Sequence, residues 1–394
     1  MGKLIYMDNA ATTFVDKRVL DAMMPYFTNE CFNPSSIYDG AQDVKVAIDN
    51  ARANIAKTLN AKSNEIFFTS CGTESDNWAI KGVAHANKEK GKHLITSKIE
   101  HHAVLHSMAS LEKEGYSVTY LDVNENGLVD TKKLEDAIRP DTILVSIMYA
   151  NNEIGTIEPI KEIGEICHKH NIYFHVDAVQ AYAHIPIDVV SDSIDLLSVS
   201  GHKFNAMKGT GFLYIKRGTK ITNFMDGGAQ EFKRRAGTEN VAGIVGMAKA
   251  TEIAHNEMKE RIDTNIKIRD YIIERLLKEI PYSRLNGDKN KMLPNNVNIG
   301  FEFIEGESLL LALNDLGVCA SSGSACTSGS LDPSHVLLAI GLPHEKAHGS
   351  LRLTISHETT IDDAKYVCDN LPKIVDRLRS MSPLYEDFIK NKGE

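Results

Sequence analysis

The sequence has no long hydrophobic run, few aromatic residues and no excess of basic residues. Aromatics make up 7% of the 394 residues, and 53 Asp and Glu outnumber 44 Lys and Arg, which gives a net charge of −9. This acidic balance argues against nucleic acid as the main partner. No segment approaches the roughly 20 apolar residues needed to cross a bilayer, and the first residues lack the apolar region of a signal peptide. We therefore expect a cytoplasmic protein without a membrane partner.

The cysteines form no Cys-x-x-Cys pair, which argues against a zinc knuckle or a thioredoxin-like motif. In a reducing compartment we expect free thiols, and any of them can act as a nucleophile once it is deprotonated. The six cysteines are Cys31, Cys71, Cys167, Cys319, Cys326 and Cys368.

Short β-branched runs alternate with amphipathic stretches between residues 65 and 215. This alternation predicts βαβ units, and therefore an α/β fold with a mostly parallel sheet covered by helices. A long helix is expected over residues 241–279, and the pattern past Pro281 indicates a second, smaller α+β domain. Ligands of parallel sheets bind outside the carboxyl ends of the strands. The residues that follow each predicted strand are therefore the candidates for a site.

Two charged residues occupy the ends of two successive predicted strands. Asp177 ends the strand predicted at 172–177, and Lys203 follows the one predicted at 195–200. A desolvated lysine amine can form a Schiff base, and a carboxylate at a strand end needs a cationic partner such as a pyridinium nitrogen. Each residue also has a simpler explanation, a surface charge for the lysine and a helix cap for the aspartate. Together they favour a pyridoxal phosphate site.

A turn of small residues links the strand predicted at 65–69 to the helix predicted at 73–88. Backbone N–H groups at a helix N-terminus bind phosphate, and Gly72 permits a close approach of the anion. Thr73 could instead simply cap this helix. A cofactor phosphate would use the same turn.

Histidine and asparagine residues follow two further predicted strands. His101 could stack on a cofactor ring and move protons near neutral pH. His102 and His106 share a helical face, which leaves a metal site open as an alternative. Asn152 could either close a turn or hydrogen-bond a ligand.

Eight motifs, in this order over about residues 4–380, resemble those of the NifS/IscS-type cysteine desulfurases. They are Asp-Asn-Ala-Ala-Thr-Thr at 8–13, Thr-Glu-Ser-Asp-Asn at 73–77, Glu-His at 100–101, Asn-Asn-Glu-Ile-Gly at 151–155, His-Val-Asp-Ala-Val-Gln at 175–180, Ser-Gly-His-Lys at 200–203, Arg-Ala-Gly-Thr at 235–238 and Ser-Ser-Gly-Ser-Ala-Cys at 321–326. The resemblance implies a homodimeric transferase of fold type I that depends on pyridoxal 5'-phosphate. It also implies a large cofactor-binding domain over residues 15–255, and a small domain from residues 1–14 and 256–394.

The same resemblance implies which side chains contact the cofactor ring. Lys203 would bind the cofactor covalently. Asp177 would pair with the ring nitrogen, and Gln180 would bond the ring hydroxyl. His101 would stack on the ring and, with Lys203, transfer protons.

Other residues would hold the cofactor phosphate and the substrate. Arg352 would pair bidentately with the substrate carboxylate, and Asn152 would assist beside the ring and the carboxylate. Thr238 would reach the phosphate bound by the partner subunit, which ties activity to dimerisation. Within one chain the phosphate would be held by Gly72, Thr73, Ser200 and His202.

Cys326 lies in a segment composed mostly of Ser, Gly, Ala and Thr. Composition alone favours a linker loop with an incidental thiol. The resemblance implies instead that Cys326 attacks the sulfur of L-cysteine and becomes a persulfide, while the amino acid leaves as L-alanine. The length of the loop is similar to that of the desulfurases that supply iron–sulfur scaffold proteins. Such a scaffold is the expected sulfur acceptor, and Cys326 would meet an iron–sulfur cluster transiently.

The sequence departs from the family pattern after the cofactor lysine, where Ala206-Met207 stands in place of the usual Gly-Pro. Pro fixes φ and Gly permits unusual φ, so we expect the chain beyond Lys203 to differ locally. Two other functions remain open from the sequence. One is a selenocysteine lyase or another pyridoxal phosphate enzyme of the same fold, and the other is a metal-dependent hydrolase.

Overall fold

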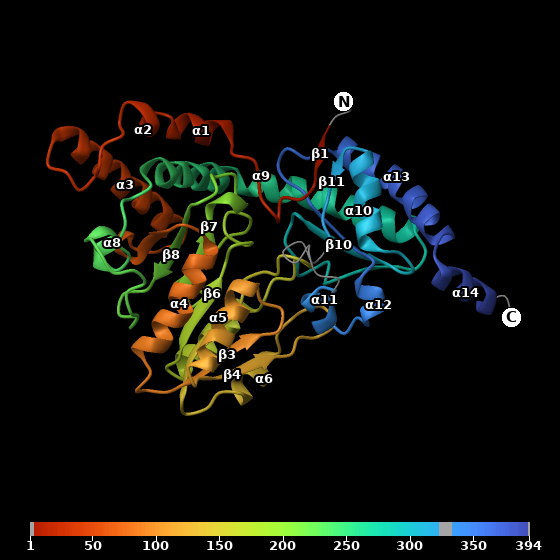
Figure 1. Ribbon diagram of the computed structural model, residues 1–394, viewed down its shortest axis with the longest axis horizontal. Coiled ribbons are helices and arrows are strands. Elements are labelled where there is room, and N and C mark those ends of the chain that lie inside the picture. The colour runs from red at the N-terminus through yellow and green to blue at the C-terminus, as the bar shows by residue number, and fades with distance from the viewer. Residues whose placement is uncertain (1–3, 323–332, 393–394) are drawn as a thin grey trace.

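The computed structural model describes residues 4–322 and 333–392. Figure 1 shows two groups of elements connected by the long helix α9 (Val241–Glu279). Ile253 of α9 packs in the core of the larger sheet, whereas Ile272 packs in the core of the smaller sheet. The domain boundary that we expected at residue 255 falls inside this helix, and the division itself stays a prediction. Across the described residues, no helix has the length and apolar character needed to span a membrane.

The larger sheet confirms the predicted mostly parallel arrangement. Its seven strands lie in the order β2-β8-β7-β6-β5-β3-β4. Strands β4, β3, β5, β6 and β7 are parallel, while β8 runs antiparallel to both β7 and β2. In this order the strands are Ile66–Thr69, Gly211–Ile215, Leu196–Ser200, Tyr173–Asp177, Thr142–Ser146, His93–Ser97 and Ser117–Leu121.

Successive strand residues pack against helices on opposite faces of this sheet, because side chains alternate along a strand. On one face Phe67 and Leu94 pack with helices α4 (Gly72–Ala86) and α5 (His102–Lys113), which lie in front of the sheet in Figure 1. Full burial of such a side chain contributes about 1.5–3 kcal/mol. Apolar side chains therefore hold the sheet against its helices, and polar residues occupy the edge that the carboxyl ends of the strands form.

The opposite face carries the core that includes α9. Here Phe68 and Ile95 pack with helices α3 (Asp39–Thr58) and α7 (Ile160–Lys169). No helix was expected before residue 65, and α3 lies there. Its many Ala, Asp and Asn residues obscure the apolar stripe of Val44, Ile48 and Ile55 that the core buries.

The smaller sheet is antiparallel, in the order β12-β10-β9, and comes mostly from the C-terminal part of the chain. It consists of Ser350–Thr354 (β12), Asn296–Phe301 (β10) and Ser283–Leu285 (β9). Near the N-terminus β1 (Ile5–Tyr6) pairs in parallel with β11 (Val318–Cys319). The N-terminal segment is therefore held against this second group of elements, before the chain crosses to α1.

The other helices are short or peripheral, apart from α13, which begins with a capping box formed by Thr360 and Asp363. They are α1 (Lys17–Met23), α2 (Pro25–Thr28), α6 (Thr131–Asp136), α8 (Gln230–Lys233), α10 (Gly306–Asp315), α11 (His335–Ala339), α12 (His344–Ala347), α13 (Ile361–Ser380) and α14 (Pro383–Lys392), with 3-10 turns η1 (Ser63–Glu65) and η2 (Gly201–Lys203).

Candidate active site

A cavity of about 600 Å³ opens at the carboxyl ends of β6 and β7 and is closed on another side by β12. Its position follows the rule for parallel sheets from which the candidates were chosen. Ten residues singled out from the sequence line this one cavity: Gly72, Thr73, His101, Asn152, Asp177, Gln180, Ser200, His202, Lys203 and Arg352.

The amine of Lys203 points to the N-terminal segment of the chain. Lys203 ends η2, directly after β7, and its Nζ donates to the backbone oxygens of Ala10 at 2.6 Å and Ala11 at 2.9 Å. Gln180 Nε2 donates to the same oxygen of Ala10 at 3.1 Å. The motif at residues 8–13 was part of the resemblance but received no role. The structure shows that it holds two of the predicted cofactor residues.

Two buried carboxyl groups, those of Asp177 and Asp76, line the cavity. Burial raises the pKa of Asp177 to about 6, while the backbone N–H of Val179 and the charge of Lys203 act in the opposite direction. Burial also raises the pKa of Asp76, and the nearby Asp177 charge raises it further. Sequence reasoning missed Asp76, which sits inside the first turns of an amphipathic helix. A cation beside two such buried carboxyl groups would favour their charged forms, and a protonated ring nitrogen would be such a cation.

The N-terminus of α4 opens into the cavity. Its N-cap residue is Cys71, which makes no side-chain cap hydrogen bond, so the alternative that Thr73 caps this helix is wrong. A Cβ at Gly72 would lie 2.6 Å from Val179 Cγ2. Ser200 Oγ is buried and has no hydrogen-bond partner in the part of the chain that the structure describes. The first N–H groups of a helix and an unsatisfied hydroxyl fit a phosphate group.

His101 is neutral and has a fixed orientation. Burial, with the charge of Lys203 next in importance, lowers the pKa of His101 to about 4. Its Nδ1 accepts the backbone N–H of Ala103 at 3.1 Å and so caps α5. Because Nδ1 is the acceptor, the ring proton lies on Nε2. Burial likewise lowers the pKa of His202 to about 4, and its ring is 3.1 Å from Thr12 Oγ1.

Three further histidine rings lie near His101. The ring of His102 is 5.1 Å from that of His106 and 4.8 Å from that of His335, measured between centroids. Within residues 4–322 and 333–392, no group of three or more His, Cys, Asp or Glu residues has an arrangement that could hold a metal ion. The alternative of a metal-dependent hydrolase therefore has no support in the described geometry.

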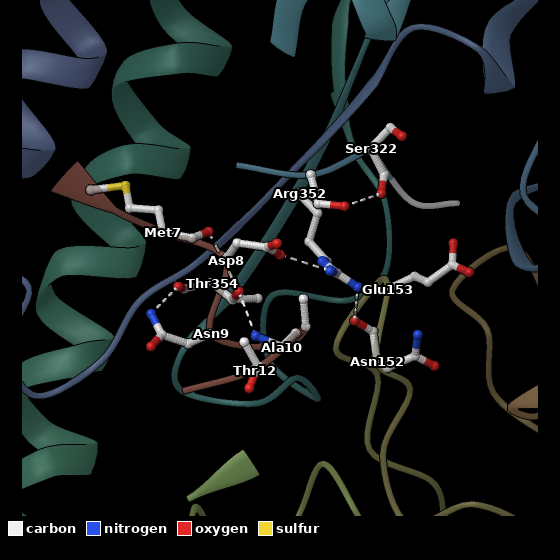
Figure 2. Close-up of polar contacts among 12 residues, drawn as sticks. Met7, Asp8, Asn9, Ala10, Thr12, Asn152, Glu153, Ser322, Arg352 and Thr354 are labelled. Atoms are coloured by element: carbon white, nitrogen blue, oxygen red, sulfur yellow. Dashed lines mark hydrogen bonds and ion pairs between the residues drawn. The ribbon is translucent and has the colours of Figure 1, made fainter. Parts of the chain in front are cut away.

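Arg352 reaches the cavity from β12, opposite the larger sheet. Its Nη2 donates to Asp8 Oδ1 at 3.0 Å and its Nη1 to the backbone oxygen of Asn152 at 3.0 Å (Figure 2). The side chain is only 3% exposed, and Nε has no hydrogen-bond partner among the described residues. A guanidinium in this state has donors left for a carboxylate that enters the cavity.

One predicted residue does not belong to this lining. Thr238 is exposed and is not among the residues that line the cavity of its own chain. Cys326 lies outside the described residues. Glu153, Ser334 and His335 do line the cavity, and sequence reasoning gave them no part in the site.

A scan of protein-family models matches residues 5–367 with the class-V aminotransferases. The chain belongs to this family. A relative from Methanosarcina thermophila, named cysteine desulfurase IscS, is 60% identical over 97% of this chain and 95% of its own length. The chain is thus a member of the NifS/IscS-type cysteine desulfurases, as the motifs indicated.

Solved structures agree with this assignment. A NifS-like protein that is 36% identical superposes with a TM-score of 0.90, over 95% of this chain and 100% of that one. A structure of SspA in complex with cysteine, also 36% identical, has a TM-score of 0.81 over 90% of this chain and 100% of its own. The predicted fold class, a fold of this family with a large mostly parallel sheet, is confirmed.

Proposed function

We propose that this member of the cysteine desulfurases binds pyridoxal 5'-phosphate and converts L-cysteine to L-alanine, with transfer of the sulfur to Cys326. One observation carries the proposal. Ten residues chosen from distant parts of the sequence line a single cavity, at the edge of the sheet where such a cofactor binds. The name of the relative from Methanosarcina thermophila and the cysteine named with the SspA structure support the choice of substrate.

The residues present fit the cofactor. Gly72 and Thr73 at the start of α4, with the unsatisfied hydroxyl of Ser200 and the ring of His202, would hold its phosphate. Asp177 would pair with its ring nitrogen, Gln180 would bond its ring hydroxyl, His101 would stack on the ring and Lys203 would bind it covalently. When bound, pyridoxal phosphate supplies an electron sink that stabilises negative charge next to the substrate amine.

The protein residues around the substrate would then bind it and move its protons. Arg352 would hold the substrate carboxylate through its remaining donors, with Asn152 alongside. Lys203 Nζ would take the proton from the substrate α-carbon, and the neutral His101 would exchange a proton at Nε2. In the sulfur step the thiolate of Cys326 attacks the substrate sulfur. The carbon–sulfur bond breaks, a sulfur–sulfur bond forms, and the carbon gains a proton, which leaves alanine and a persulfide.

We also propose a homodimer and a sulfur-acceptor protein, for which an iron–sulfur scaffold is the best candidate. Large apolar side chains are exposed near the N-terminus, among them Phe27 (55%) and Ile37 (95%). Such exposure is typical of an interface. Thr238, exposed in one chain, would in the dimer reach the phosphate bound by the partner subunit. A cytoplasmic location is part of the same proposal.

The decisive experiment measures alanine released from L-cysteine, with reductant present, by the wild-type protein and by Cys326→Ala. We expect the variant to lose desulfuration and to keep the cofactor absorbance. A variant that desulfurates at the full rate would disprove the role of Cys326. Alanine from L-selenocysteine alone would favour the selenocysteine lyase, and a protein that takes up no pyridoxal phosphate would refute the cofactor.

A further inference from the structure

A buried hydrogen bond joins two distant segments at the wall of the cavity. Ser334 Oγ donates to Glu153 Oε2, although the two residues are 181 positions apart. Glu153 follows β5 in the loop that also contains Asn152, and Ser334 immediately precedes α11. Both residues line the cavity, with exposed fractions of 4% and 5%. Breaking a hydrogen bond between polar groups that are so well buried costs free energy, because each group would lose its partner.

Ser334 fixes the start of α11. While it donates to Glu153, its Oγ accepts the backbone N–H groups of Val336 at 3.1 Å and Leu337 at 3.3 Å, as an N-cap residue does. His335 Nε2 hydrogen-bonds the backbone oxygen of Glu100 at 2.9 Å. Val336 and Leu337 are fully buried. The helix is only five residues long, so these contacts, and not its own hydrogen bonds, determine its position.

Glu153 is in turn held in place by its neighbours. Its backbone N–H donates to Asn151 Oδ1 at 2.8 Å, and its backbone oxygen accepts from Asn298 Nδ2 of β10 at 3.0 Å. Figure 2 shows Glu153 next to Arg352. Burial raises the pKa of Glu153 to about 7, and Ser334 and Arg352 act against this rise. The carboxyl group therefore sits on a rigid support, and among residues 4–322 and 333–392 its side-chain hydrogen-bond partner is Ser334.

We propose that Glu153 is a positioning residue for the sulfur-transfer step, which it serves by fixing Ser334 and the start of α11 on the cavity wall. This inference rests on the proposed function. Residue 326 precedes Ser334 by eight residues. Ser334 is the second described residue after the segment that contains Cys326, so its contact with Glu153 fixes, on the cavity wall, the point at which the described chain resumes. Glu153 itself touches none of the reacting atoms in this role.

The test separates substrate binding from sulfur transfer in the holoenzyme. With Glu153→Ala and with Ser334→Ala, we expect the absorbance change on adding L-cysteine to occur at the wild-type concentration of L-cysteine. Persulfide formation on Cys326 in a single turnover, followed with sulfur-labelled cysteine, should slow by roughly tenfold or more, the order expected if the loss of one buried hydrogen bond acts on this step. The double variant should be no slower than either single variant, because the two residues act through one contact.

Two control variants identify the cause. Glu153→Gln keeps the size of the side chain and one acceptor oxygen, so its transfer rate should stay close to that of the wild type. Glu158 is an equally buried glutamate that accepts the N–H of Val129 at 2.9 Å and does not line the cavity. Glu158→Ala should lower the stability of the fold. It should leave unchanged the ratio between the rate of the absorbance change and the rate of persulfide formation.

The outcomes distinguish this inference from the proposed function. If the wild-type protein forms neither alanine nor persulfide, the proposed function fails and the positioning role falls with it. If the wild type is active and both alanine variants transfer sulfur within twofold of its rate, only the positioning role is wrong. Equal loss of the absorbance change and of transfer would indicate a merely structural residue and would also overturn the inference.

Discussion

Lys203 and Arg352 bring positive charge to one cavity from two different sheets. Lys203 follows β7 of the larger sheet, and its amine is bound by the neutral carbonyls of Ala10 and Ala11. Arg352 belongs to β12 of the smaller sheet, and its guanidinium is bound by the charged Asp8. The N-terminal segment at residues 8–11 thus contacts both groups.

The difference in surroundings suits different tasks. An amine that is to react must leave its hydrogen-bond partners, which for Lys203 include two backbone carbonyls. A guanidinium stays protonated in any protein environment, and the carboxylate of Asp8 keeps it oriented while Nε remains available. These surroundings are consistent with the proposed roles, covalent chemistry on the side of the larger sheet and recognition of the substrate carboxylate on the side of the smaller sheet.

Replacement of Lys203 should have the largest effect. Lys203→Ala removes the amine, and Lys203→Arg keeps a positive charge without a usable nucleophile. We expect both variants to lose alanine formation by about 10⁴-fold, near the upper limit for a catalytic proton-transfer group. Steady-state alanine release measures this. If Lys203→Arg kept more than a tenth of the activity, charge rather than nucleophilicity would explain the lysine.

Replacement of Arg352 should affect binding more than chemistry. Arg352→Lys keeps the charge but loses the planar pair of donors, so the KM for L-cysteine should rise about tenfold to a hundredfold, the range for a hydrogen bond between charged groups. Cysteamine, which is cysteine without the carboxylate, is the control substrate. Its turnover by the variant should match that of the wild type. An equal loss with both substrates would mean that Arg352 does not recognise the carboxylate.

Replacement of Asp177 should change stability with a definite dependence on pH. The folded-state pKa of Asp177, about 6, lies above its unfolded value of about 3.9, so the wild-type protein loses stability as pH rises through this interval. Asp177→Asn removes the loss. The free energy of unfolding of the cofactor-free variant should therefore exceed that of the cofactor-free wild type by about 1–3 kcal/mol at pH 8, and by less than about 1 kcal/mol at pH 4. Urea unfolding of both proteins at the two pH values measures the difference.

Asp188 supplies a control of opposite sign. Hydrogen bonds from the backbone N–H groups of Ser191 and Val190 lower its pKa, so its charged form is favoured by folding. Asp188→Asn should give no gain in stability at pH 8. If both asparagine variants shifted stability in the same direction, burial of the Asp177 charge would not be the cause.

The sequence predicted the site best where strands end. Asp177 and Lys203 were chosen because they follow neighbouring strands, and parallel strands bring their carboxyl ends to one edge. The turn at Gly72 was found for the same reason. Strands β2 and β3 are short runs that are buried along their whole length, and they were predicted within a residue or two of their bounds.

The sequence predicted the site poorly where residues that are far apart in the sequence contact one another. Nothing local indicates that Asp8 pairs with Arg352, 344 residues away, or that Ser334 bonds Glu153. Arg352 entered the site only through the resemblance. In the sequence, Asp76 looks like one of several polar residues in an amphipathic helix. Only its burial beside Asp177 shows that it belongs to the site.

By itself, the sequence determined the class of fold, the edge of the sheet where chemistry takes place and the family motifs. The first two follow from the spacing of apolar residues and from which residue follows each strand, and the motifs are short stretches of the sequence itself, so all three are local properties. Only the tertiary structure decided the burial that raises the pKa of Asp177 and Asp76, the orientation of Arg352 and the contact that fixes the start of α11. Burial and pairing depend on which distant segments pack together, and a linear sequence does not specify that residue by residue.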